Sequence, residues 1–128
     1  MSTSLLFKAS AITEVVTGLA LLFAPLFVVG LLLGDGLGPT GVAVARVLGI
    51  GLLAVGVAGW ESPGQDMRLA PWAGLCIYNI GVAIVFVVFG SYGGMNGVLL
   101  WPVAVLHALF GAAMLSTILA SSQTATDE

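Results

Sequence analysis

The side chains that could carry chemistry in this chain lie inside long apolar stretches. Glu14, Tyr78, Asn79 and His107 each fall about nine or ten residues from the start of such a stretch. At about 1.5 Å of helix rise per residue, these positions share one level near the middle of a membrane. Polar and ionisable groups are costly at that depth, so these residues are candidates for function.

Arg46 also lies inside an apolar stretch, about six residues from its start. Its long side chain could cover the remaining distance of about 6 Å to the level of Glu14. We therefore expect an ion pair in which each buried charge satisfies the other. The pair fails if the first apolar stretch is one unbroken helix to Leu33, because the two charges would then lie about 20 Å apart.

Together these side chains predict one ligand-binding or buried polar cluster: Glu14, Arg46, Tyr78, Asn79 and His107. Each member could instead have only a structural role, in an ion pair or in hydrogen bonds that hold helices together.

The chain has one histidine and no Cys-x-x-Cys, which argues against a bis-His haem, a His-rich zinc site and dithiol exchange. We expect no metal, no cofactor and no catalytic residue, and the residues support no class of enzyme.

The composition places the chain in a lipid bilayer. Of its 128 residues, 59% are hydrophobic and 7% are charged, whereas a soluble domain carries about 25% charged residues. Three basic residues cannot neutralise many phosphates, so nucleic-acid binding is excluded. The single cysteine, Cys76, excludes a disulfide scaffold.

Glycine, proline and asparagine divide the chain into apolar segments of about the 20 residues that a spanning helix needs. Loops are expected over residues 34–39, 61–66 and 90–97. The pattern predicts one domain over residues 1–120, a polar disordered tail over 121–128, and four spans, at residues 4–24, 40–60, 69–90 and 97–120. Backbone groups in lipid must be satisfied internally, so we expect an all-α transmembrane four-helix bundle.

Pro25 divides the first apolar stretch, which runs from Leu5 to Leu33. Proline lacks a backbone donor, so we expect the first span to end there and a short apolar helix at the membrane interface to follow. One continuous helix kinked at Pro25 is the alternative. A cleaved signal peptide is disfavoured, because the apolar region is too long and Glu14 interrupts it.

The charges between the spans predict the orientation. Lys8 and Arg68 fall on one side of a four-span protein, and the opposite loops carry only Asp35. The excess of basic residues on the inner side therefore places both termini in the cytoplasm. Aromatic residues near the span ends are expected at the interfaces: Trp60, Trp72, Tyr92 and Trp101.

Small residues four apart predict close helix contacts. They occur at Ala45 and Gly49, and again at Ala104, Ala108 and Ala112. The second span contains more glycine than one bundle needs, and four short helices enclose little volume. We therefore expect a homo-oligomer or other membrane subunits as partners.

The segment ARVLGIGLLAVG, residues 45–56, resembles the second helix of small DoxX-like bacterial membrane proteins of unassigned function. The four-span layout, the lone histidine in the last span and the chain length also fit that group. The resemblance implies a bacterial inner-membrane protein that is an accessory to respiratory or redox systems. It brings no active site with it.

A second segment, AITEVVTG at residues 11–18, is similar to the first helix of small multidrug resistance transporters. In that family one membrane carboxylate exchanges protons for a cationic drug, and the resemblance gives this role to Glu14. The fixed positive charge of Arg46 departs from the family's pattern, and the aromatic residues of its binding chamber have no match here.

Two functions follow from these observations. The first is a non-catalytic membrane module that binds a lipid-like or quinone-like molecule, or that serves as an accessory subunit of a membrane complex. Arg46, Tyr78, Asn79 and His107 would donate hydrogen bonds to the polar head of such a ligand. The alternative is a proton-coupled small-molecule transporter that works as a dimer, with Glu14 as the exchangeable carboxylate. A carboxylate locked to arginine releases its charge poorly, which argues against the alternative.

Overall fold

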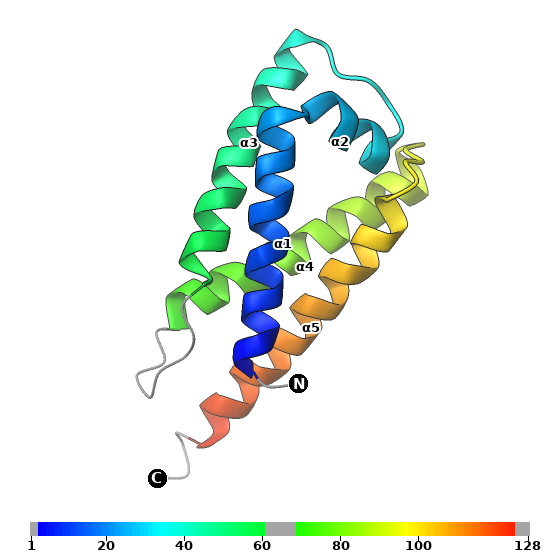
Figure 1. The fold of residues 1–128 in the computed structure, drawn as a ribbon. Helices are drawn as coiled ribbons and strands as arrows, with labels where there is room; N and C mark the ends of the chain where they lie inside the picture. Colours follow the sequence, from blue (N-terminus) through cyan, green and yellow to red (C-terminus); the bar gives the residue numbers. More distant parts are fainter. Residues whose placement is uncertain (1–2, 61–68, 125–128) are drawn as a thin grey trace.

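The computed structural model describes residues 3–60 and 69–124, and within these ranges all regular structure is helical. The helices are α1 (Thr3–Phe23), α2 (Pro25–Leu33), α3 (Pro39–Ala58), α4 (Leu69–Tyr92) and α5 (Leu100–Thr124). Four of them, α1, α3, α4 and α5, are long and apolar enough to cross a membrane. The predicted all-α transmembrane four-helix bundle is therefore confirmed (Figure 1).

The first apolar stretch forms two helices, as the position of Pro25 predicts. Ala24 leaves the helical conformation, with φ −133° and ψ 53°, and Pro25 then begins α2. Proline suits the first position of a helix, where a backbone N–H has no intrahelical partner. The chain turns at this point, so α2 runs across one end of the bundle instead of extending α1 (Figure 1).

Helices α1 and α3 form one antiparallel pair, and α4 and α5 form the other (Figure 1). The backbones of α1 and α3 touch through glycine. A Cβ added to Gly49 would lie 2.7 Å from the Gly18 carbonyl oxygen, and one added to Gly56 would lie 2.8 Å from the Ala11 carbonyl oxygen. The close contact predicted from Ala45 and Gly49 is therefore present, with both residues buried.

The small-residue stripe predicted on α5 is not its contact face. Ala104 is buried, but Ala108 and Ala112 are exposed. The buried positions recur instead at Ala104, His107 and Gly111, which share one helix face at spacings of three and four residues. This face packs against α4 and carries His107 into the bundle.

One end of the bundle holds the two pairs together through an apolar core, formed by Leu6, Phe7, Trp72, Leu75, Cys76 and Met114. The rings of Phe7 and Trp72 stack with their centroids 4.1 Å apart. Trp72, at the start of the third candidate span, is 5% exposed, because the stacked ring of Phe7 and the neighbouring core cover it.

At the other end, α2 is fixed to the connection between α4 and α5. The backbone N–H of Asn96 donates to the Leu33 carbonyl at 3.2 Å, and that of Leu99 donates to the Leu31 carbonyl at 2.9 Å. Gly97 lies so close to the backbone of α2 that a Cβ there would overlap it. Helix α2 therefore bridges the two helix pairs.

Helix α5 departs most from the predicted boundaries. Helix α5 begins at Leu100, three residues later than expected, and it continues to Thr124, through the first half of the predicted polar tail. The expected loop at residues 61–66, Arg68 and the last four residues of the tail lie outside the described residues.

Candidate functional site

Polar side chains from α1, α4 and α5 meet in the interior of the bundle. Four of them are 5% exposed or less: Ser10, Glu14, Asn79 and His107. The amide nitrogen of Asn79 donates to the Ser10 hydroxyl at 3.0 Å and to the Leu75 carbonyl at 2.9 Å. Its amide oxygen lies 2.8 Å from His107 Nδ1. Asn79 thus connects α4 both to α1 and to α5.

These contacts determine which atoms donate. The Leu75 carbonyl can only accept, so the NH2 group of Asn79 must face it, and the amide oxygen of Asn79 must face His107. His107 Nδ1 then carries the proton that it donates. In the neutral ring the other nitrogen, Nε2, keeps a lone pair.

Glu14 lies beside His107 with an incomplete set of hydrogen bonds. Its Oε1 atom is 3.9 Å from His107 Nδ1 and has no hydrogen-bond partner in the described part of the chain. The Tyr78 hydroxyl is the other polar group that interacts with this carboxylate. The Tyr78 ring in turn meets the His107 ring edge-on, with centroids 5.8 Å apart. A buried polar atom without a partner costs about 1–3 kcal/mol, so Oε1 needs an explanation.

Arg46 does not join this cluster, contrary to the expectation from sequence. Its side chain is exposed, and no ion pair with Glu14 occurs among the described residues. Gly18 lies against Gly49, so in this antiparallel pair Glu14 is level with Leu53. That is seven residues beyond Arg46, or about 10 Å along the axis.

The face of α3 gives a second reason. The residues of α3 that are buried follow a helical stripe, at Ala45, Gly49, Leu52 and Gly56. Arg46 comes one residue after this stripe begins, and one residue is about 100° around a helix of 3.6 residues per turn. The arginine is therefore directed away from α1, and the described structure places no fixed cation beside Glu14.

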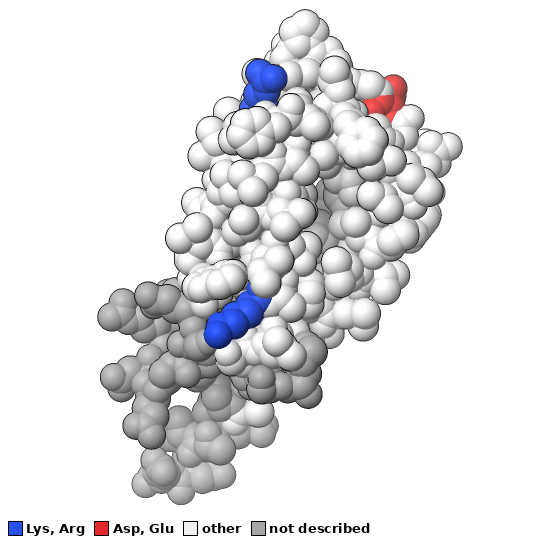
Figure 2. Space-filling model, in the orientation of Figure 1, with Lys and Arg blue, Asp and Glu red and all other residues white. Residues whose placement is uncertain are grey.

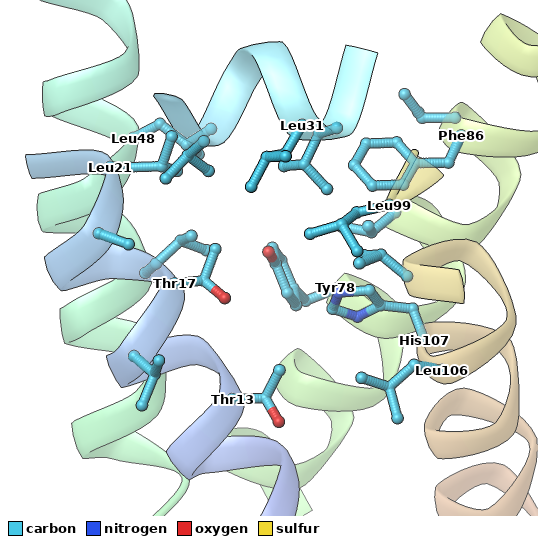
Figure 3. A pocket seen from close by; sticks show the side chains of 18 of the residues that line it. Thr13, Thr17, Leu21, Leu31, Leu48, Tyr78, Phe86, Leu99, Leu106 and His107 are labelled. Atoms are coloured by element: carbon cyan, nitrogen blue, oxygen red, sulfur yellow. The ribbon is translucent and has the colours of Figure 1, made fainter. Parts of the chain in front are cut away.

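An apolar cavity of about 680 Å³ opens next to the polar cluster. Helices α1, α4 and α5 supply most of its wall, and α2 covers one end through Phe27, Val28, Leu31 and Leu32. Its polar lining groups are Thr13, Thr17, Tyr78 and His107. In Figure 3 the Tyr78 hydroxyl and the His107 ring project toward the centre of the cavity. A volume of this size is typical of a site for a small organic ligand.

The outer surface agrees with a lipid environment. Figure 2 shows few, widely separated charged side chains on one face of the molecule, with uncharged atoms between them. Many large apolar side chains of the spanning helices are exposed, including Val47, Ile77 and Leu109. Such a surface is stable only where hydrocarbon or another protein covers it.

The sequence-based site therefore comes together in part. Glu14, Tyr78 and Asn79 each lie against His107, and Arg46 lies elsewhere. Ser10 belongs to the cluster although it was not singled out as a site residue. Its position one helical turn before Glu14 was the available signal. The α2 lining gave no signal, because that helix is uniformly apolar.

No family model matches this chain, and neither a curated protein nor a solved structure is similar to it at a significant level. Among residues 3–60 and 69–124, no three His, Cys, Asp or Glu side chains gather as metal ligands would. The cavity and the polar cluster beside it are therefore the features of this chain that bear on its function.

Proposed function

We propose that this chain is a small integral membrane protein that binds one lipid-like or quinone-like molecule. The observation that carries the proposal is the apolar cavity of about 680 Å³ with Tyr78 and His107 in its lining. Apolar walls of this kind accept a hydrocarbon tail, while a few polar groups orient the head of the ligand. The tail would occupy the space between α1, α2 and α4, and the head would contact His107.

The proposal extends to where the protein works. The DoxX-like resemblance of residues 45–56 supports the bacterial inner membrane and a role as an accessory subunit of a membrane complex. Lys8 and Arg68 support cytoplasmic termini. The exposed apolar faces of the helices leave room for a second copy or for other membrane subunits.

Filling the cavity tests the proposal. Gly81 lines the cavity, and a Cβ added to it meets no atom within 4 Å. We expect Gly81→Leu to fold normally and to place its side chain in the cavity, where it competes with the ligand for space. Native mass spectrometry of gently purified protein should then show a retained long-chain molecule on the wild type and at least fivefold less of it on the variant.

Gly74→Leu is the matched control. Gly74 is also on α4 and also faces open space, but it does not line the cavity. The control should keep its ligand at the wild-type level. Equal retention by Gly81→Leu and Gly74→Leu would show that the cavity is not the binding site. The same spectra would also reveal any different subunits that remain bound.

One observation favours a second candidate, the proton-coupled transporter with Glu14 as exchangeable carboxylate. Glu14 is buried and is not paired with Arg46, so the main argument against this function no longer holds. The test is uptake of tetraphenylphosphonium into proteoliposomes under an imposed proton gradient. Transport requires gradient-dependent uptake that Glu14→Gln abolishes, whereas uptake that is equal in both proteins, or absent from both, excludes transport of this cation.

A further inference from the structure

Two of the polar groups that line the cavity have already used their donors. His107 Nδ1 donates to Asn79, and the Thr13 hydroxyl donates to the Ala9 carbonyl at 3.0 Å. The Tyr78 hydroxyl projects into the cavity (Figure 3), where it can both donate and accept. The protons of His107 Nδ1 and of Thr13 are therefore directed into the protein and away from a ligand.

The acceptors, in contrast, remain available. His107 Nε2 keeps its lone pair because Nδ1 carries the ring proton. Behind it, Glu14 Oε1 lacks a partner although the side chain is 1% exposed. The Thr17 hydroxyl, also in the lining, can both donate and accept a hydrogen bond. Among the polar groups of the lining, His107 Nε2 is therefore the one that can only accept.

We propose that the cavity selects a ligand whose head carries a hydroxyl group, which donates a hydrogen bond to His107 Nε2. This inference rests on the proposed function and names the chemical class of its ligand. A long-chain phenol, a hydroquinone or an isoprenoid alcohol fits. A quinone or an ester would bring only acceptors to the same position, and the lone pair of His107 would stay unpaired.

A pair of matched ligands tests the hydroxyl group directly. A para-alkylphenol and its methyl ether share the ring and the tail, but only the phenol can donate. We expect isothermal titration in detergent micelles to show about tenfold tighter binding of the phenol, which corresponds to about 1.4 kcal/mol. Equal affinity of the two ligands for the wild type overturns the proposal without any need for a variant.

The His107→Asn variant tests the acceptor. An asparagine amide reaches about as far as Nδ1 and can still donate to the amide oxygen of Asn79, but it places no atom at the position of Nε2. We expect the preference for phenol to fall to within about twofold, with a melting temperature close to that of the wild type. Ser116→Ala is the control on the same helix, because its hydroxyl donates only to the Ala113 carbonyl at 2.8 Å. A preference that survives in His107→Asn overturns the proposal.

Two further arms separate the remaining outcomes. The affinities of a hydroquinone and of an isoprenoid alcohol with equal tails identify which kind of hydroxyl compound the cavity binds. The proposal is supported if the hydroquinone binds more tightly than its quinone, or if the alcohol binds more tightly than its ester. If phenol and ether bind equally and Gly81→Leu displaces both, the cavity binds lipid without selecting a hydroxyl group. If neither ligand binds and Gly81→Leu changes nothing, the proposed function itself is wrong.

Discussion

Asn79 is the residue on which the polar cluster depends. Its side chain bonds Ser10 on α1 and His107 on α5, so a single amide connects three helices. The bond to the Leu75 carbonyl orients the amide, and the amide in turn orients the imidazole. At the scale of residues, the cluster is a chain of oriented hydrogen bonds that ends at the cavity.

Replacing the Asn79 side chain tests whether its hydrogen bonds between helices stabilise the protein more than a hydrogen bond within one helix does. We expect Asn79→Leu to lower the free energy of unfolding by about 1–3 kcal/mol, because it leaves the Ser10 hydroxyl and His107 Nδ1 buried without partners. Unfolding by sodium dodecyl sulfate in mixed micelles measures the change. Ser116→Ala, which removes a hydrogen bond within one helix, should change stability by less than about 0.5 kcal/mol. Equal effects of the two substitutions would mean that Asn79 does not hold the helices together.

Between elements, two kinds of contact build the molecule. Helices α1 and α3 approach through glycine until backbone atoms touch, and α2 is held by backbone hydrogen bonds to residues 96–99. In lipid, hydrocarbon surrounds both the associated and the separated helices, so close packing and hydrogen bonds supply the association energy. Polar contacts and α2 join the two helix pairs around the cavity. Because the pairs are not joined there by packed apolar side chains, the cavity between them remains open.

Gly49 and Gly51 on α3 offer a matched test of the glycine contact. A Cβ on Gly49 would lie 2.7 Å from a backbone oxygen, whereas one on Gly51 meets no atom within 4 Å. We expect Gly49→Ala to destabilise the protein by about 1–3 kcal/mol through overpacking. Gly51→Ala should stabilise it by about 0.5–1 kcal/mol, since alanine is the better helix former. The same detergent titration measures both, and a destabilised Gly51→Ala or an unchanged Gly49→Ala would contradict the packing described here.

The whole molecule is a bundle with its two described ends on the same side, since four spanning helices alternate in direction (Figure 1). Arg46 lies toward the other side, about level with residue 21 of α1 when the Gly18–Gly49 contact is taken as the reference. The basic residues that argue for cytoplasmic termini are therefore Lys8 and Arg68, with Arg46 opposing them.

Labelling of single cysteines measures the orientation. The native Cys76 is buried and is replaced by alanine, and a cysteine is introduced at Asp35 or at Trp60, which are both exposed and lie at opposite ends of the bundle. With cytoplasmic termini, a membrane-impermeant maleimide should label Asp35→Cys in intact cells and Trp60→Cys only after lysis. The opposite pattern would reverse the proposed orientation.

The four spans, the break at Pro25 and the level shared by Glu14, Asn79 and His107 could be predicted from the sequence. Each depends on local chemistry, namely the length of an apolar run, the missing N–H of proline and the rise per residue of a helix. The contact face of α3 could be predicted only in part. The small residues Ala45 and Gly49 indicated it, but Arg46 was assigned to the same interior although it points about 100° away from Ala45 around the helix. Periodicity in so uniformly apolar a sequence does not distinguish the face toward a neighbouring helix from the face toward lipid.

By itself, then, the sequence determined the solvent, the number of crossings and the polar residues at mid-depth. Only the tertiary structure decided that the polar neighbours of Glu14 are His107 and Tyr78 and that Arg46 is not among them. Glycine at residues 18, 49 and 56 set the register of α1 against α3 through backbone contact. The cavity depends on α2 crossing the end of the bundle. Register, helix face and enclosed volume arise from contacts between segments far apart in the chain, so no local pattern encodes them.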